Sequence, residues 1–221
     1  IVGAFQDAID EYYVTANARL LKVVMATGGI VVGVLAGLYI ATRFGISFPT
    51  TPNRLTLADT ALQYLGALLI AASFAIRNHT HIFGVLTAGA VGMLGWWVSR
   101  LVLEFGLGIV LACGVAAAVI GLMATFVSRF WKIPSLAIIA AGVVPLVPGL
   151  SLYNGLMGVV ANPMGDAQFT VALGTLVQAV MIGFAVAAGA TLGNIIGRPL
   201  RRRMVQLYNR LPRRRLSSPK P

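Results

Sequence analysis

Two prolines and a glycine interrupt an apolar run, and the backbone groups that they leave free could bind a small ligand. The segment VVPLVPGLSLYNG contains Pro145, Pro148 and Gly149, and no charged residue occurs in the run Ile133–Val160. Proline removes a backbone N–H and leaves the carbonyl about one turn earlier without its helical partner. Glycine permits backbone angles that other residues resist. The segment therefore predicts two half-helices joined by an irregular connection.

Such a break offers hydrogen-bonding groups to a small ligand. The N–H groups that begin the second half-helix can receive a carboxylate, because a helix N-terminus carries partial positive charge. The freed carbonyls, near Ala141 to Val144, can accept from an ammonium group, as in the discontinuous helices of transporters. Ser151, Tyr153 and Asn154 follow in the first turn and can hydrogen-bond a small polar substrate. From physics alone, a transport site and a structural kink are equally well supported.

The composition of the chain places this break in a membrane. The 221 residues are 58% hydrophobic and 10% charged, with a mean hydropathy of +0.86, whereas soluble domains have about 25% charged residues. Several apolar runs reach the roughly 20 residues that cross about 30 Å of hydrocarbon as a helix. In lipid the backbone amides must be satisfied within the helix itself.

We predict an all-α polytopic membrane helix bundle of about six transmembrane helices, one of them broken by proline. The predicted spans are approximately Leu21–Thr42, Thr60–Ile76, Ile82–Leu101, Leu107–Val127, Ile133–Val160 and Phe169–Gly197. Positively charged flanks tend to stay in the cytoplasm. With both ends of the chain inside, all 17 basic residues except Arg43, Arg54 and Arg100 fall on the cytoplasmic side. This bias predicts cytoplasmic N- and C-termini.

The charged and polar residues argue against other function classes. The net charge of +11 is concentrated after the last span, where a basic cluster anchors the topology and contacts anionic lipid. Nucleic-acid binding is therefore not expected. His79 and His81 give too few ligands for a zinc site. Without a phosphate loop, a nucleophile elbow or an HExxH motif, we predict no enzyme, no catalytic residue, no metal and no cofactor.

Two spans carry glycines four residues apart, which lets helix backbones approach closely in a membrane. Both spans are therefore predicted to be buried against other helices. The glycines are Gly29, Gly33 and Gly37 in the first span and Gly189, Gly193 and Gly197 in the last.

Two stretches of the sequence resemble a known family. IPSLAIIAAGVVPLVPGLSLYNGLMG is similar to the proline-rich signature in the C-terminal half of the bacterial threonine/serine exporter family. DAIDEYYVTANARLLKVVMATGGIVVGVLAGL is similar to the end of that family's N-terminal half. The resemblance covers nearly the whole chain, and the PLVPG stretch is its most specific part.

The resemblance implies a domain organisation. Residues 1–43 would be the end of the N-terminal exporter half with its last transmembrane span. Residues 44–197 would be the C-terminal half with five spans, and residues 198–221 a basic cytoplasmic tail. The chain then starts within a larger protein of ten spans in the bacterial inner membrane, and the missing N-terminal half is its expected partner. Whether it forms a homo-oligomer stays open.

The resemblance also implies export of threonine or serine driven by the proton motive force. Dicarboxylate export, with succinate as substrate, is the close alternative, and a non-transporting membrane scaffold is a second class. No span has an acid or base at its centre. We therefore expect the ammonium contact and the proton carrier in the missing half, with Asp7 and Asp10 as local candidates. The expected substrate-binding residues are Pro145, Pro148, Gly149, Ser151, Tyr153 and Asn154.

Overall fold

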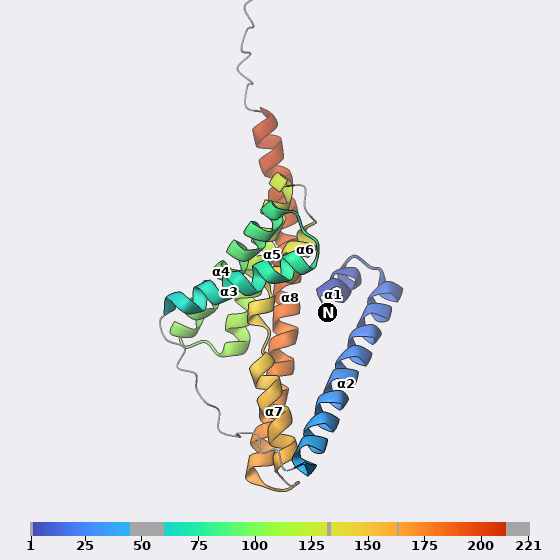
Figure 1. The fold of residues 1–221 in the computed structure, drawn as a ribbon. Coiled ribbons are helices and arrows are strands. Elements are labelled where there is room, and N and C mark those ends of the chain that lie inside the picture. The colour runs from blue at the N-terminus through green and yellow to red at the C-terminus, as the bar shows by residue number, and fades with distance from the viewer. Residues whose placement is uncertain (1, 45–59, 132–133, 163, 211–221) are drawn as a thin grey trace, which may run out of the picture.

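A computed structural model of the chain describes residues 2–44, 60–131, 134–162 and 164–210. These residues form α-helices and one 3₁₀ turn (Figure 1), which confirms the predicted all-α polytopic fold. In chain order they are α1 (Val2–Ile9), α2 (Tyr13–Arg43), α3 (Thr60–Arg77), α4 (Ile82–Glu104), α5 (Ile109–Trp131), α6 (Ser135–Gly142), the 3₁₀ turn η1 (Val144–Leu146), α7 (Gly149–Ala161) and α8 (Ala167–Arg210).

The number of spans is the part of the prediction that differs. Among the described residues, α2, α4, α5 and α8 are long and apolar enough to cross a membrane, and the bent α6–α7 pair makes a fifth span if counted as one. The remaining predicted span, α3, has 18 residues. At about 1.5 Å per residue it covers about 27 Å, just under the roughly 30 Å of hydrocarbon. Residues 45–59, which precede it, lie outside the described part.

Two helices extend past their predicted boundaries. The first long helix begins at Tyr13 rather than Leu21, and the last continues to Arg210 rather than ending at Gly197. Both extensions carry arginine, which is a good helix former, so the apolar run marks the membrane segment but not the helix. The first part of the predicted basic tail is thus helical, while residues 211–221 lie outside the described part.

The closest helix packing joins α5 and α8. Gly193 of α8 lies so near α5 that an added Cβ would meet the backbone carbonyl of Ala118, and Gly189 faces the carbonyl of Gly114 in the same way. From the other side, a Cβ on Gly121 of α5 would meet the carbonyl of Ala190. The predicted burial of the glycine face of the last span is therefore confirmed.

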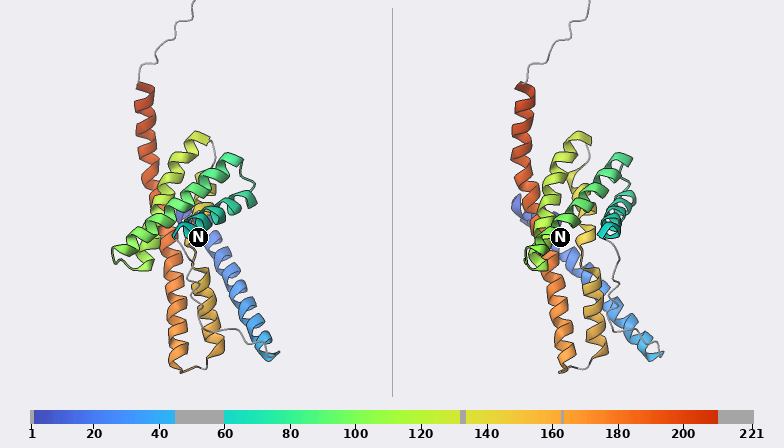
Figure 2. Two further views of the ribbon diagram at one scale, coloured as in Figure 1. Left: turned by 60° about the vertical axis from the view of Figure 1, so that its left-hand side comes forward. Right: turned by 90° about the vertical axis from the view of Figure 1, so that its left-hand side faces the viewer.

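The same prediction is wrong for the first span within this chain. Helix α2 lies to one side of the bundle in Figure 1 and in the left view of Figure 2, and its main contacts are with α1 and α7. An added Cβ on Gly29, Gly33 or Gly37 would meet nothing within 4 Å. Spacing of small residues marks a surface suited to close packing, but it does not supply the partner.

The broken helix joins two groups of helices. Helix α6 packs against α3, α4 and α5, whereas α7 packs against α8 and α2. Figure 1 shows α6 beside the upper group and α7 extending alongside the first part of α8. The break between them is therefore where the chain passes from one group to the other.

Candidate functional site

The predicted break is present and has a defined geometry. Helix α6 ends at Gly142, the turn η1 contains Pro145, and α7 begins at Gly149 after a bend of 51°. Val147 is extended (φ −68°, ψ 126°), as expected for a residue that precedes proline. Pro148 follows with φ −79° and ψ 57°. These angles end one helix and start another in a new direction.

Local hydrogen bonds satisfy part of the backbone at the break. The N–H groups of Leu146 and Val147 donate to the carbonyls of Val143 (3.0 Å) and Val144 (3.1 Å). These two carbonyls were among those predicted to be free, and the 3₁₀ turn occupies them. A smaller set of backbone groups is thus left for a ligand than the sequence indicated.

The start of α7 keeps two donors without a backbone acceptor. The Gly149 N–H donates to the Val147 carbonyl (2.8 Å), and the Leu152 N–H donates to the Pro148 carbonyl (3.0 Å). Among the described residues, no backbone hydrogen bond uses the N–H of Leu150 or Ser151. Initial N–H groups of a helix are the donors that bind anions. Two backbone donors are therefore left at the start of α7.

The predicted site residues divide between two sides of α7. Gly149, Tyr153 and Asn154 are exposed, and a Cβ on Gly149 would meet nothing within 4 Å. Ser151 is partly buried and lies one turn before Gly155, which packs against α8. Because residues four apart share a helix face, the structure brings Gly149 and Tyr153 together and turns Ser151 toward α8.

The two prolines are partly buried and form the connection itself. The turn η1, with Pro145, contacts α3 and α4. Leu146 is 4% exposed and belongs to the main apolar cluster together with Val143. One side of the break is therefore anchored in the bundle, while Val147 and Leu150 are exposed on the other.

A buried polar pair between α5 and α8 was not predicted from the sequence. The Thr125 hydroxyl lies 2.8 Å from Asn194 Oδ1 and 2.9 Å from the Gly121 carbonyl. The two side chains are 1% and 2% exposed. Asn194 directly follows Gly193, so a polar residue within the glycine face was the available signal. This pair aligns the two most closely packed helices.

The short helix α1 brings acidic residues to the side of α8. Phe5 contacts Phe184 edge-on, with ring centroids 6.4 Å apart, and Val2 packs against the apolar cluster that contains Val143 and Leu146. Gln6 is buried at 7% exposure. Figure 1 shows α1 between α2 and α8. The N-terminal helix is thus packed on the bundle rather than projecting from it.

Both acidic residues that were predicted as local candidates form ion pairs. Asp7 Oδ2 is buried and lies 3.0 Å from Arg19 Nη1 of α2, an ion pair that does not have hydrogen-bond geometry. Asp10 pairs with Arg198 of α8 through contacts of 3.0 and 3.4 Å. The structure therefore places Asp7 beside α2 and Asp10 beside α8.

Comparison with known proteins identifies the family. A family model described as "Threonine/Serine exporter, ThrE" matches residues 63–196, from α3 to near the end of the apolar part of α8. The chain belongs to the threonine/serine exporter family. The matched range contains the α6–α7 break, so this break is part of the exporter domain. The family membership predicted from the PLVPG stretch is confirmed.

Two curated relatives extend the similarity across the chain. A threonine/serine exporter of Corynebacterium glutamicum is 31% identical over 209 residues, and a probable threonine/serine exporter of Mycobacterium tuberculosis is 31% identical over 208 residues. Each alignment covers 91% of this chain but only 40% and 39% of the relatives. The chain thus spans about two fifths of the length of these exporters. No solved structure matches it.

Proposed function

We propose that the chain forms part of an inner-membrane secondary transporter that exports threonine or serine, with the α6–α7 break on the substrate path. The observation that carries this proposal is the start of α7. There, the N–H groups of Leu150 and Ser151 have no backbone acceptor, next to the exposed side chains of Tyr153 and Asn154. Family membership supplies the substrate class, because both relatives are named as exporters of these amino acids.

The proposed site suits the carboxylate end of an amino acid. The two free N–H groups and the helix dipole favour a negative charge at this position. Tyr153 and Asn154 can hydrogen-bond the substrate hydroxyl. Pro145 and Pro148 separate α7 from the preceding helix, and Gly149 leaves the start of α7 without a side chain. The site lacks a counter-charge for the ammonium group, which we assign to the part of the exporter that this chain does not contain.

Coupling to the proton motive force is part of the proposal. A proton carrier needs a titratable group in the protein, and Asp7 and Asp10 on the α1 side of the bundle are the local candidates. Asp7 fits better, because its side chain is 19% exposed whereas that of Asp10 is 38% exposed. Residues 1–43 would then form the end of the first half of the exporter, and residues 44–197 would form the second half. Both ends of the chain would be cytoplasmic.

Dicarboxylate export is the second candidate. The observation that favours it is the absence of an acidic side chain among the predicted substrate-binding residues, since a helix N-terminus binds any carboxylate. A succinate exporter would need a second anion site instead of an ammonium site. A scaffold without transport would need only the close α5–α8 packing.

Export from loaded cells tests these candidates. Cells that contain the full-length protein are loaded with threonine, serine or succinate, and the efflux of each is measured for wild type, Asn154→Ala and Pro148→Ala. Asn162→Ala is the matched control, because Asn162 lies at the other end of α7 and bonds the Gly158 carbonyl (2.8 Å). We expect threonine or serine efflux to fall in the first two variants only. Wild-type efflux of none of the three compounds would refute transport, and unchanged efflux in both variants would refute the site.

A further inference from the structure

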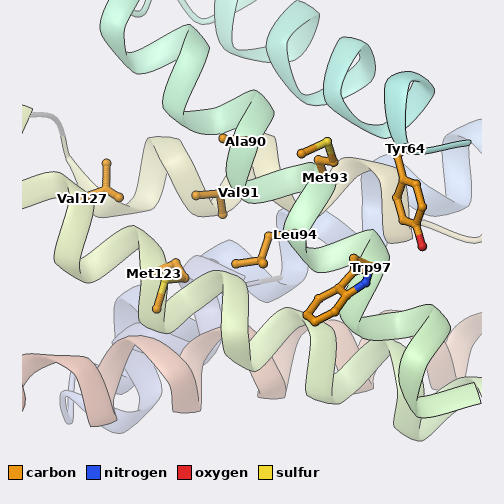
Figure 3. A pocket seen from close by; sticks show the side chains of 8 residues that line it. All are labelled: Tyr64, Ala90, Val91, Met93, Leu94, Trp97, Met123 and Val127. Atoms are coloured by element: carbon orange, nitrogen blue, oxygen red, sulfur yellow. The ribbon is translucent and has the colours of Figure 1, made fainter. Parts of the chain in front are cut away.

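An open groove of about 490 Å³ lies across α4, between α3 and α5. Figure 3 shows its lining, with Tyr64 and Trp97 at one end and Met123 and Val127 at the other. Ala90 and Trp97 of α4 both line it, so it runs for about 10 Å along that helix at about 1.5 Å per residue. The residues of the α6–α7 break do not line this groove.

The surface of the groove is apolar throughout. Tyr64 and Trp97 line one end of it, and the other lining side chains are aliphatic or methionine. Tyr64 follows the start of α3 closely, and Trp97 lies toward the end of α4. These helix ends are on the same side of the bundle, where amphipathic aromatic rings prefer the membrane–water interface.

A cationic side chain lies about one helical turn beyond Trp97. Arg100 lies three residues after Trp97 on α4, so the two share a helix face, and its side chain is exposed. Arginine near the end of a membrane helix extends toward the interface, and its guanidinium group binds phosphate oxygens with more than one hydrogen bond. An anionic group would therefore find a partner just outside the groove.

We propose that this groove binds one acyl chain of a membrane phospholipid, with the phosphate near Arg100. Hydrocarbon is the solvent around a membrane helix, and an apolar groove left empty would lose its packing contacts. A ligand with a long apolar part and one anionic end matches the apolar groove and the cation beyond its aromatic end. A protein helix would need no cation at one end and has a diameter of about 10–12 Å with its side chains.

Filling the groove tests the proposal without disturbing the core. Ala90 is exposed on the groove wall, so Ala90→Phe adds a ring where the acyl chain would lie. Val180→Phe adds a ring at an exposed site on α8 outside the groove and is the matched control. The full-length protein is purified in detergent, titrated with phosphatidylglycerol, and analysed by native mass spectrometry. We expect Ala90→Phe to weaken binding of the tightest phospholipid on the order of tenfold, the effect of about two lost methylene contacts.

The headgroup is tested by a second comparison. Diacylglycerol with the same chains lacks the phosphate, so Arg100→Gln should weaken binding of phosphatidylglycerol but leave diacylglycerol unchanged. Quenching of Trp97 fluorescence by brominated acyl chains, in a Trp96→Phe, Trp131→Phe background, gives an independent readout of the position. Equal lipid binding by Ala90→Phe and wild type would overturn the proposal. So would Trp97 shielded from brominated lipid in the intact protein, which would indicate a protein partner on this face.

Discussion

Arg198 of α8 and Asp10 after α1 form a two-point ion pair across 188 residues of sequence, with Nη1–Oδ1 and Nη2–Oδ2 distances of 3.0 and 3.4 Å. Together with the Phe5–Phe184 ring contact, this pair fastens α1 to the side of α8. It also holds Asp7 close to the bundle, because Asp7 lies on α1. The N-terminal segment thus contacts the last helix at two positions, through Phe5 and through Asp10.

Reversing one charge of this ion pair should affect export more than stability. Asp10→Arg places two cations together and is expected to release α1 from α8, which lowers amino-acid efflux. The side chains are 43% and 38% exposed, so the pair contributes only about 0–1 kcal/mol to stability. Asp10→Arg with Arg198→Asp restores the opposite charges and should recover efflux. Equal efflux in the single and double variants would show that the pair is not needed.

Adding a methyl group at Gly193 should destabilise the helix bundle. The new Cβ of Gly193→Ala would meet the backbone carbonyl of Ala118, which cannot rotate away as a side chain can. Overpacking of this kind costs about 1–3 kcal/mol. Thermal unfolding in detergent measures the loss. Gly183→Ala on the same helix is the control, because its added Cβ meets nothing within 4 Å, and it should melt no lower than wild type.

Removing the Thr125 hydroxyl should weaken the contact between α5 and α8. Thr125→Val leaves Asn194 Oδ1 without its buried donor, and hydrogen bonds between membrane helices contribute on average about 0.6 kcal/mol, with a maximum near 1.7. Thr175→Val is the matched control, since that exposed hydroxyl bonds only the Val171 carbonyl of its own helix. A melting temperature equal in the two variants would contradict a stabilising role for the buried pair.

Substitution of Gly149 should separate folding from transport. An added side chain at Gly149 meets no atom within 4 Å, so Gly149→Val is expected to fold normally. Its branched side chain would nevertheless screen the N–H groups of Leu150 and Ser151, and efflux of threonine or serine should fall. Fluorescence-detected size-exclusion chromatography measures folding, and efflux from loaded cells measures transport. Unchanged efflux in a normally folded variant would place the substrate elsewhere.

A second glycine on α7 provides the contrast. Gly155 faces α8, and its added Cβ would lie 2.7 Å from the Leu176 side chain. Gly155→Val should therefore lower the melting temperature, by an amount that depends on how far Leu176 can move. If Gly155→Val and Gly149→Val had the same thermal stability, the described orientation of α7 would be wrong.

The helix break was predictable because proline acts locally. Pro145 and Pro148 remove particular backbone donors wherever the chain lies, so the interruption follows from the residues themselves. The hydrogen bonds that occupy the Val143 and Val144 carbonyls were not predictable, because they depend on the tight turn that the chain adopts after α6. The predicted roles of the six substrate-binding residues stay predictions.

Contacts between residues far apart in the chain could not be predicted from the sequence. The same four-residue glycine spacing occurs in α2 and α8, yet only the glycines of α8 are packed against another helix. The difference lies in what surrounds each helix, which spacing does not encode. The pairing of Asp10 with Arg198 likewise depends on the path of the whole chain.

The connection between α6 and α7 has a mechanical consequence. Each backbone hydrogen bond described there joins residues no more than one helical turn apart, from Val143 bonded to Ile139 to Leu152 bonded to Pro148. None of these bonds ties α7 to the helices around α6. Rotation about the backbone bonds of Val147 would therefore break none of these hydrogen bonds, whereas rotation at Pro148 would break the bond from the Gly149 N–H to the Val147 carbonyl, which closes around that proline.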